Sequence, residues 1–401
     1  MTLPLPLAGV RVLAVEQYGA GPFGTQYLSD LGADIIKVEN PKEGDVGRHV
    51  GPYFVDGAQD SAASLFFQSN NRAKRSLTLD LKSAEGQRVF RLLVKNADAV
   101  CHNLRGDVPG KLKLTYDDLK TANPRIVCAH LTAYGRDNER ATWPGYDYLM
   151  QAEAGYLSLT GEPDGPPARM GLSIVDMMTG LSMSYGLVAA VLSARTTGQG
   201  RDVDVTLFDT ALYNLSYVAH WYLAAGHNER RRPRSAHPSL VPCQLVKTKD
   251  GWIFLMCNKE KFWGRLCEII SRPEWASDPR FATFKDRFER RDEVSDMLDQ
   301  ALAARTTDDW IDRFAGQVPA APLRDVAGAL ENPFVRRRGR IRTQKRPDGK
   351  TVQLLVSPIQ MAGMAYPEAT APEHGQHTDE ILREAGLATN EITALRKAGV
   401  I

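Results

Sequence analysis

Asp176 is the only charged residue between Met170 and Ser193, and its neighbours are apolar or small. A carboxylate among Ile, Val and Met side chains is expected to be partly desolvated, and burial of an unpaired carboxylate is costly. Two interpretations fit such a residue. It caps the start of a helix through hydrogen bonds, or it serves as a nucleophile in catalysis. The residue types alone favour the helix cap.

Glycines near the start of the chain have the spacing of a phosphate-binding turn. Residues 19–24 satisfy the pattern G-x-G-x-x-G between a strand-like and a helix-like run, and Glu39 ends the next strand-like run. This arrangement is typical of dinucleotide-binding proteins. However, residues 16–18 separate the strand from the first glycine, and an Asn-Pro pair follows Glu39. We therefore expect a loop that approaches a nucleotide-containing ligand at a helix N-terminus, and not necessarily a nicotinamide one.

The first 130 residues alternate between strand-like and helix-like segments. Such alternation predicts an α/β fold, with a Rossmann-like parallel sheet and helices on its faces. The predicted strands are Val10–Val15, Asp34–Val38, Ala99–His102 and Ile126–Leu131, and the predicted helices are Thr25–Leu31, Ala84–Asn96 and Leu114–Lys120.

The composition changes after a predicted helix from Leu207 to Ala225. Residues 227–242 are rich in Arg, Pro and Ser and are typical of a linker, and a smaller mixed α/β region follows. The tail has too little core to fold alone, so we expect it to return to the first domain. The predicted domains are residues 1–226 with 331–401, and residues 227–330.

Composition and charge are those of a soluble globular protein. The 401 residues are 43% hydrophobic and 24% charged, and the net charge of +2 argues against a nucleic-acid surface. Five cysteines without a C-x-x-C pair favour neither a disulfide framework nor a zinc site, which fits a reducing compartment. The N-terminus does not have the pattern of a signal peptide. Residues 170–193 approach membrane-spanning length, but their polar residues favour a buried helix. We expect a cytoplasmic protein without membrane or nucleic-acid partners.

Seven segments, which follow one another along nearly the whole chain, resemble the class III coenzyme A transferases. This family includes formyl-CoA transferase, carnitine CoA-transferase and succinyl-CoA-dependent dicarboxylate CoA-transferases, and the chain looks most like the last group. The resemblance covers nearly the whole chain. The segments are Leu7–Leu13, Leu31–Glu39, Lys74–Lys82, His102–Arg105, Pro144–Asp147, Gly161–Pro167 and Gly375–Glu380.

The resemblance implies a function and a mechanism. It favours Asp176 as the nucleophile over Asp176 as a helix cap. CoA would pass from an acyl-CoA donor, such as succinyl-CoA, to a carboxylic acid acceptor, expected to be a dicarboxylate. A mixed anhydride and an aspartyl-CoA thioester would form on Asp176. Coenzyme A is then part of the substrate, and neither a permanently bound cofactor nor a metal is expected. Family members form homodimers whose two chains are interlinked like rings.

The resemblance also assigns contacts to coenzyme A. The backbone N–H groups of Gly19 and Ala20 are candidates to stabilise the reacting groups, and Tyr146 and Asp147 match residues beside the nucleophile. One residue departs from the pattern, because Asn40 stands where formyl-CoA transferase has an arginine. The remaining expected contacts are Leu79, Asp80 and Lys82 in an adenosine-binding loop, and Asn103, Leu104, Arg105 and Lys111 in a phosphate-binding region.

Three alternatives to transfer between two acids stay open. An α-methylacyl-CoA racemase shares the fold and the aspartate, but it has histidine in place of Tyr146, and a tyrosine with a pKa near 10 is a poor base. A non-catalytic CoA-binding protein would be expected to have lost the aspartate. Intramolecular transfer within one dicarboxylyl-CoA is the third alternative. A dicarboxylate's second carboxylate needs a cation, for which His237, Arg48 and Arg169 are candidates.

Overall fold

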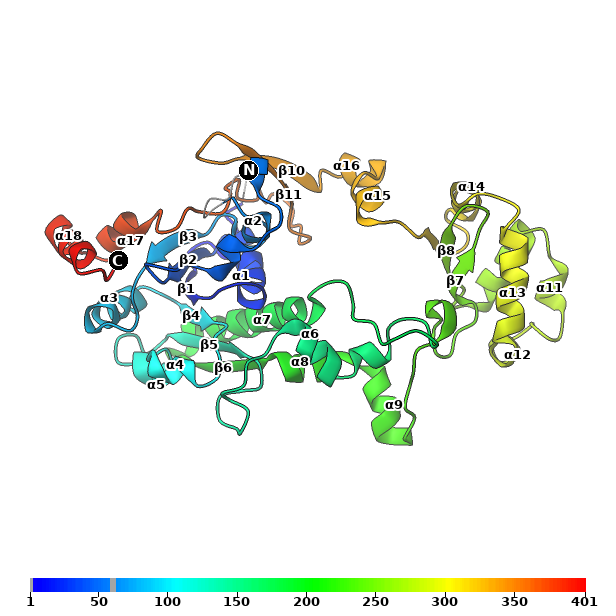
Figure 1. The fold of residues 1–401 in the computed structure, drawn as a ribbon, viewed down its shortest axis with the longest axis horizontal. Helices are drawn as coiled ribbons and strands as arrows, with labels where there is room; N and C mark the ends of the chain where they lie inside the picture. The colour runs from blue at the N-terminus through cyan, green and yellow to red at the C-terminus, as the bar shows by residue number, and fades with distance from the viewer. Residues whose placement is uncertain (1–2, 58–62) are drawn as a thin grey trace. The chain divides into compact units, whose positions relative to one another are not determined.

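The chain forms two compact units in a computed structural model, which describes residues 3–57 and 63–401 (Figure 1). The first unit contains the chain up to Ala154, Gly171–Ser216 and Arg338–Ile401, and the second contains Gly155–Met170 and Tyr217–Arg337. The tail thus belongs to the first unit. The boundaries of the second unit fall at residues 216 and 337, whereas the sequence indicated 226 and 330, and residues 155–170, which the sequence placed in the first domain, also belong to the second unit. At the boundary near residue 216, the helix predicted over residues 207–225 is interrupted by Ser216, which has a φ of 51°.

A six-stranded sheet forms the centre of the first unit, and all its neighbouring strands are parallel. The strand order β3-β2-β1-β4-β5-β6 is that of a Rossmann fold, so the predicted fold class is confirmed. The order reverses between β1 and β4, and ligands bind such sheets at the carboxyl ends of the strands beside this reversal. The strands are β1 Arg11–Val15, β2 Asp34–Glu39, β3 Arg75–Thr78, β4 Ala99–His102, β5 Val127–Thr132 and β6 Arg201–Thr206.

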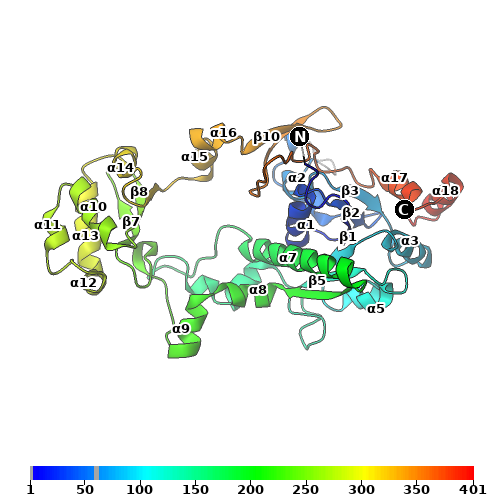
Figure 2. The same cartoon turned by 180° about the vertical axis from the view of Figure 1, so that it is seen from behind.

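Helices cover both faces of this sheet. Side chains of β1 such as Leu13 join a core cluster with Phe90 of α3 (Ala84–Val94) and with the C-terminal helices α17 (Thr378–Glu384) and α18 (Thr389–Lys397). Helix α7 (Ile174–Thr197) packs on β5 and β6 and against α1 (Ala20–Asp30), as Figure 2 shows from behind. Shorter elements of this unit are α2 Leu65–Asn71, α4 Val108–Lys111, α5 Tyr116–Leu119, α6 Asp147–Glu153, α8 Leu207–Asn214, β10 Ile341–Lys345 and β11 Thr351–Leu355.

The second unit has its own core. Strands β7 and β8 pair antiparallel, β9 pairs with β8, and Trp263, Leu298 and Trp310 are buried with them. Its elements are α9 Tyr217–Ala225, β7 Cys243–Lys247, β8 Trp252–Met256, α10 Glu260–Ile269, α11 Glu274–Ser277, α12 Phe284–Glu289, α13 Arg291–Leu302, α14 Thr307–Phe314, β9 Ala320–Pro322, α15 Val326–Leu330 and α16 Pro333–Arg337.

The first turns of α1 contain the glycine motif that the sequence placed in a loop. The helix starts at Ala20, whereas the sequence predicted a start at Thr25. The glycines allow a close approach of two helices. A Cβ atom on Gly24 would lie 2.4 Å from the carbonyl oxygen of Gly180 in α7, and one on Gly180 would lie 2.4 Å from that of Ala20. The contact brings the N-terminal part of α7, with Asp176, beside the start of α1.

Helix α7 is the single helix in the described residues that is long and apolar enough to cross a membrane, and half of its most apolar window is buried within the chain. Its packing is that of a core helix on the sheet, in line with the interpretation from sequence.

Gly180→Ala is expected to destabilise the fold. The new methyl group would overlap a backbone oxygen of α1, so the two helices would have to separate, at a cost of about 1–3 kcal/mol. Gly264→Ala is the matched control, because a Cβ at this helical position meets no atom within 4 Å. Urea unfolding measures both variants. Equal changes in the free energy of unfolding would show that the α1–α7 contact does not require glycine.

Candidate active site

A cavity of about 370 Å³ opens in the first unit at the carboxyl ends of β1 and β4, where the strand order reverses. Asp176 lies in its wall. The other lining residues come from the end of β5, from the segments after β1, β4 and β5, from the first residues of α1, α4 and α8, and from the approach to α6. They are Gln17, Tyr18, Gly19, Ala20, Asn103, Leu104, Arg105, Val108, Leu131, Thr132, Ala133, Trp143, Pro144, Gly145, Tyr146 and Leu207.

Asp176 is the third residue of α7 and is 9% exposed. Ser173 precedes the helix, so Asp176 does not occupy the capping position, and no side chain caps this end. Among the described residues, no hydrogen-bond donor pairs with the Asp176 carboxylate. Instead its backbone N–H donates to Oδ2 of Asp147, at 2.9 Å. The carboxylate is therefore left available within the cavity.

Gly19 closes one side of this carboxylate. A Cβ atom on Gly19 would lie 2.6 Å from Oδ2 of Asp176, so glycine is required by the available space. The φ of Gly19 is −101°, which other residues also adopt, so the backbone conformation alone does not require it. At the start of α1 beside it, the first backbone N–H groups have no partner within the helix. Such groups suit an anion or a developing negative charge.

Burial raises the pKa of the Asp176 carboxyl group to about 7, and the negative charge of Asp147 adds to the shift. Asp147 is 4% exposed, and its Oδ1 accepts a hydrogen bond from the Gln151 amide at 2.6 Å. Near neutral pH, Asp176 is thus a poorly solvated carboxylate in equilibrium with its acid. Weak solvation of this kind favours nucleophilic attack.

The sequence matches the model of "CoA-transferase family III" over residues 7–378. The chain belongs to this family.

Relatives of this family III chain cover nearly all of it. A succinate–glutarate CoA-transferase of Agrobacterium fabrum is 34% identical over 97% of each chain. A succinyl-CoA:mesaconate CoA-transferase of Haloarcula hispanica is 31% identical, over 96% of this chain and 97% of its own. The crystal structure of a CaiB/BaiF family protein from Brucella suis is 33% identical, with a TM-score of 0.82 over 96% of this chain and all of the other. The recognised family is confirmed.

The structure gathers most of the family III site residues expected from the sequence. Asp147 lies directly behind Asp176 and bonds its backbone. The side-chain amide of Asn103 is bonded to the backbone of Gln17, which limits what it can offer to coenzyme A. The expected residues that line the cavity are Gly19, Ala20, Asn103, Leu104, Arg105, Tyr146 and Asp176.

Other expected contacts lie away from the cavity wall. Leu79 is 2% exposed and belongs to the hydrophobic core, and the Asp80 carboxylate accepts from the backbone N–H of Lys82. Lys111 is exposed and pairs with Asp107 at 2.5 Å, as Arg105 also does. The assigned roles of these residues in binding coenzyme A remain predictions.

Two cations suggested for a second carboxylate are already engaged. Arg48 is buried and forms a bidentate ion pair with Glu39. Glu39 is the acid of the dinucleotide-binding pattern, so this pairing also engages the residue expected to bind a ribose. Nδ1 of His237 accepts from two backbone N–H groups, and burial, with the positive charge of Arg291, lowers the pKa of this histidine. The buried pairing of Arg48 with Glu39 rules it out as the cation for a second carboxylate, and the suggested role of His237 stays a prediction. Arg169 is exposed and donates to the carbonyl oxygen of Met170.

Gln17, Tyr18, Thr132 and Trp143 are cavity residues that sequence reasoning missed. Gln17 and Tyr18 come directly after β1, so their place at the carboxyl end of a central strand could have identified them. Trp143 has no comparable signal, because it lies in an irregular segment.

Activity is expected to rise with pH through a midpoint near 7, because the reacting form of Asp176 is the carboxylate. Asp147→Asn should move this midpoint to lower pH, since it removes the negative charge but keeps an oxygen that can accept from the Asp176 N–H. Single-turnover rates between pH 5 and 9 measure the midpoint. The control is Asp312→Asn, an exposed acid of α14. An unmoved midpoint in Asp147→Asn would contradict this account of the Asp176 pKa.

Proposed function

We propose that the protein transfers CoA from succinyl-CoA or a similar donor to a dicarboxylic acid, with Asp176 as the nucleophile. The observation that carries the proposal is a buried carboxylate that no hydrogen-bond donor of the described residues contacts, in a cavity at the carboxyl ends of the central strands. The named relatives support the substrate class, because two of them act on glutarate and mesaconate.

The proposed reaction has two symmetrical halves. An oxygen of Asp176 attacks the thioester carbon of the donor, the C–S bond breaks, and a mixed anhydride and CoA thiolate result. The thiolate attacks the carbonyl carbon of Asp176, and the donor acid leaves with the bridging oxygen. In the second half, the acceptor carboxylate attacks the aspartyl thioester and releases the thiolate. The thiolate then takes the acyl group of the acceptor and restores the Asp176 carboxylate.

The surroundings of Asp176 suit both intermediates, which water would otherwise hydrolyse. The carboxylate is largely buried, and Leu131, Ala133 and Leu207 contribute apolar wall to the cavity. The start of α1 supplies backbone N–H groups for the oxyanion formed at each attack. Gly19 and Ala20 remain the candidates for this role.

The racemase alternative requires a second acid–base group opposite Asp176, and the histidine that would supply it is absent from its position in this chain. No histidine is found among the described residues that line the cavity, and Tyr146, at the position of the racemase histidine, is 65% exposed. Incubation with a single acyl-CoA in deuterated water, without an acceptor acid, separates the two activities. We expect no α-proton exchange. Exchange at the rate of turnover would replace the transferase proposal with a racemase.

The direct test is transfer itself. Purified protein is incubated with succinyl-CoA and each of glutarate, mesaconate, malate and oxalate, and the acyl-CoA products are identified by mass spectrometry. Borohydride added during turnover should reduce the aspartyl thioester and mark Asp176. Isotopically labelled free acid separates intermolecular transfer, in which the label enters the acyl-CoA, from transfer within one molecule. Failure of every pair of donor and acid would overturn the proposed function.

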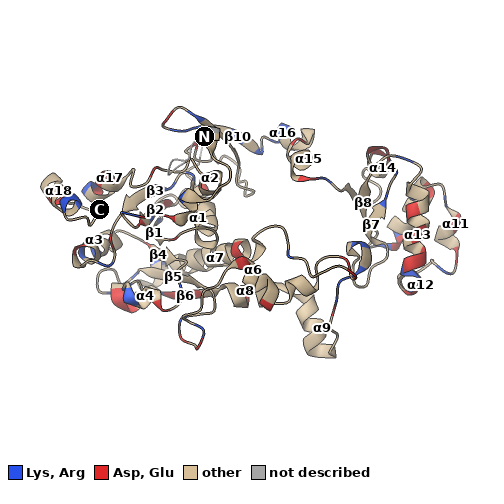
Figure 3. Ribbon diagram, in the orientation of Figure 1, with Lys and Arg blue, Asp and Glu red and all other residues tan. Residues whose placement is uncertain are grey.

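We further propose that the protein acts as a cytoplasmic homodimer. Helix α9 carries no buried residue and no charged one, and Figure 3 shows it wholly in the colour of uncharged residues. Tyr185 of α7 and Tyr213 of α8 are 82% and 86% exposed. Exposed apolar and aromatic side chains of this kind, present on each unit, are typical of surfaces covered by another chain. The five thiols are all buried and unpaired, as suits a reducing compartment.

A further inference from the structure

Tyr18 adopts a backbone conformation that is unusual for its residue type. Its φ is +65°, in the left-handed region, which costs a residue with a side chain roughly 1 kcal/mol or more. It stands between Gln17 and Gly19, and all three line the cavity. A conformation of this cost persists only where the surrounding structure enforces it, and such residues concentrate at functional sites.

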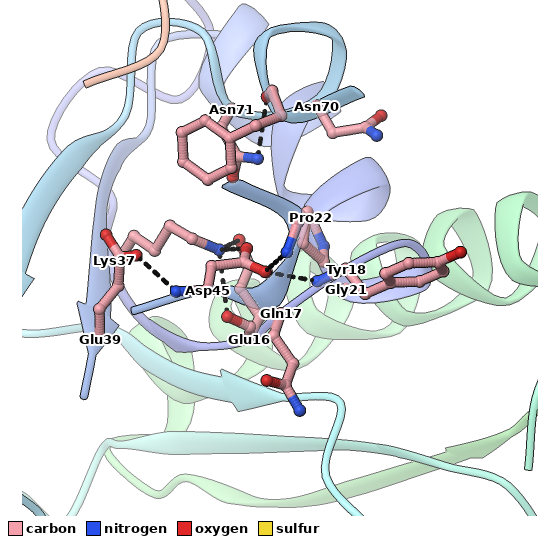
Figure 4. A network of polar contacts seen from close by, with 12 residues as sticks. Glu16, Gln17, Tyr18, Gly21, Pro22, Lys37, Glu39, Asp45, Asn70 and Asn71 are labelled. Atoms are coloured by element: carbon pink, nitrogen blue, oxygen red, sulfur yellow. Dashed lines mark hydrogen bonds and ion pairs between the residues drawn. The ribbon is translucent and has the colours of Figure 1, made fainter. Parts of the chain in front are cut away.

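Asp45 supplies a contact that enforces this conformation. Its Oδ1 accepts from the backbone N–H of Tyr18 at 2.9 Å and from that of Gly47 at 2.7 Å. Its Oδ2 pairs with Nζ of Lys37 at 2.7 Å. Asp45 is 2% exposed and Lys37 is fully buried, so water does not compete for these contacts. Figure 4 shows Asp45 between Lys37 and the backbone of Tyr18.

Lys37 ties Asp45 to the end of β1. Its Nζ also donates to the carbonyl oxygen of Glu16 at 3.1 Å, one residue before the cavity segment begins. The buried network around this pair is balanced in formal charge, so each of its charged groups has an opposite charge beside it. Its three acids are Glu16, Glu39 and Asp45, and its three bases are Lys37, Lys74 and Arg48.

Asn103 holds the same segment from β4. Its Nδ2 donates to the carbonyl oxygen of Gln17 at 2.6 Å, and its Oδ1 accepts from the Gln17 N–H at 2.9 Å. Side chains from two directions therefore fix the backbone of adjacent residues, Asn103 at Gln17 and Asp45 at Tyr18. The next residue is Gly19, which abuts the Asp176 carboxylate.

We propose that Asp45 is a positioning residue for CoA transfer. It holds Tyr18 in the left-handed conformation and thereby keeps Gly19 and the start of α1 in register with Asp176. The inference rests on the proposed function, because it assigns Asp45 to the chemistry of that site. Reacting groups misplaced by about 1 Å can lose about 10²-fold in rate. Loss of this contact should therefore lower kcat more than it raises KM.

The first test compares Asp45→Ala with Asp45→Asn. Alanine removes the acceptor for the Tyr18 N–H, whereas asparagine keeps an amide oxygen in the same place and loses only the charge that faces Lys37. We expect kcat to fall by about 10-fold to 10²-fold in Asp45→Ala and to stay within about 3-fold of the wild type in Asp45→Asn, which should lose mainly stability. If Asp45→Ala does not fold, Asp45→Ala and Asp45→Asn are each combined with Lys37→Met. This second substitution removes the buried lysine that the loss of Asp45 leaves without its partner.

The second test separates positioning from a structural role. Glycine adopts positive φ readily, so Tyr18→Gly should release the segment from its need for Asp45. In the Tyr18→Gly background, Asp45→Ala is expected to change kcat by less than about 3-fold. An equal loss of kcat in both backgrounds would assign Asp45 to the stability of the 45–49 turn and overturn the proposal.

Remaining outcomes are also decisive. A loss in Asp45→Asn as deep as that in Asp45→Ala would show that the charge matters and not the backbone contact. Unchanged kcat in Asp45→Ala would exclude positioning. Wild-type turnover with succinyl-CoA and the acid panel is measured first, so that a failure of the proposed function is recognised separately from a failure of the Asp45 proposal.

Discussion

Asp176→Asn is expected to abolish CoA transfer and at the same time to stabilise the fold. Asparagine cannot form the anhydride, so transfer should fall by at least about 10³-fold. The gain in stability follows from the pKa of Asp176, which is about 7 in the folded protein and about 4 in an unfolded chain. Because the folded-state value is the higher one, the stability linked to this group is complete below pH 4. It is lost as the pH rises to 7.

Asparagine stays neutral, so the variant should avoid this loss. At pH 8 its free energy of unfolding should exceed that of the wild type by about 1–4 kcal/mol, while at pH 4 the two should nearly coincide. Urea unfolding at both pH values measures the difference, with Asp312→Asn as the charge-matched control. A variant that is inactive but no more stable at pH 8 would contradict the view that Asp176 is a desolvated carboxylate in the folded protein.

The sheet could be predicted where its strands are apolar and buried on both faces. The strand predicted over residues 99–102 is confirmed at both ends as β4, and all four of its residues are buried. Strand β6 was missed because its sequence, Arg-Asp-Val-Asp-Val-Thr, alternates charged and apolar residues at the edge of the sheet. The start of α1 was missed because glycine and proline in its first turns have poor helix propensity, and the packing against α7 overrides it.

The candidate site was predictable only in part. Asp176 stands out because its apolar neighbours make a lone charge conspicuous in the sequence. Asp147 and Asp45 act through contacts with backbone N–H groups 29 and 27 residues away, and no sequence pattern encodes such pairings. The positive φ of Tyr18 is equally hidden, since tyrosine gives no sign of it. The resemblance named the neighbours of Asp176, but it could not show that Arg48 is paired with Glu39 in the core and is therefore not available to a substrate.

Gly19→Ala is expected to lower transfer by about 10²-fold or more while leaving the fold intact. The φ of −101° accepts alanine, but the new methyl carbon would lie 2.6 Å from Oδ2 of Asp176. Either the carboxylate rotates out of the cavity or the segment at the start of α1 moves away from it, and both changes misplace the nucleophile. Single-turnover rates test this loss against Gly264→Ala, which adds the same methyl group in open space.

The cause of that loss can be isolated by removing the carboxylate. In the Asp176→Ala background the methyl group of Gly19→Ala no longer meets an oxygen, so any destabilisation that it causes in the wild type should disappear from urea unfolding. If the substitution costs the same free energy in both backgrounds, the methyl group clashes with something other than Asp176. If Gly19→Ala retains full activity, the contact between this segment and the carboxylate is not needed for transfer. Two results together would place the requirement for glycine at the reacting oxygen itself. Gly19→Ala would have to lose activity, and its cost in stability would have to disappear in the Asp176→Ala background.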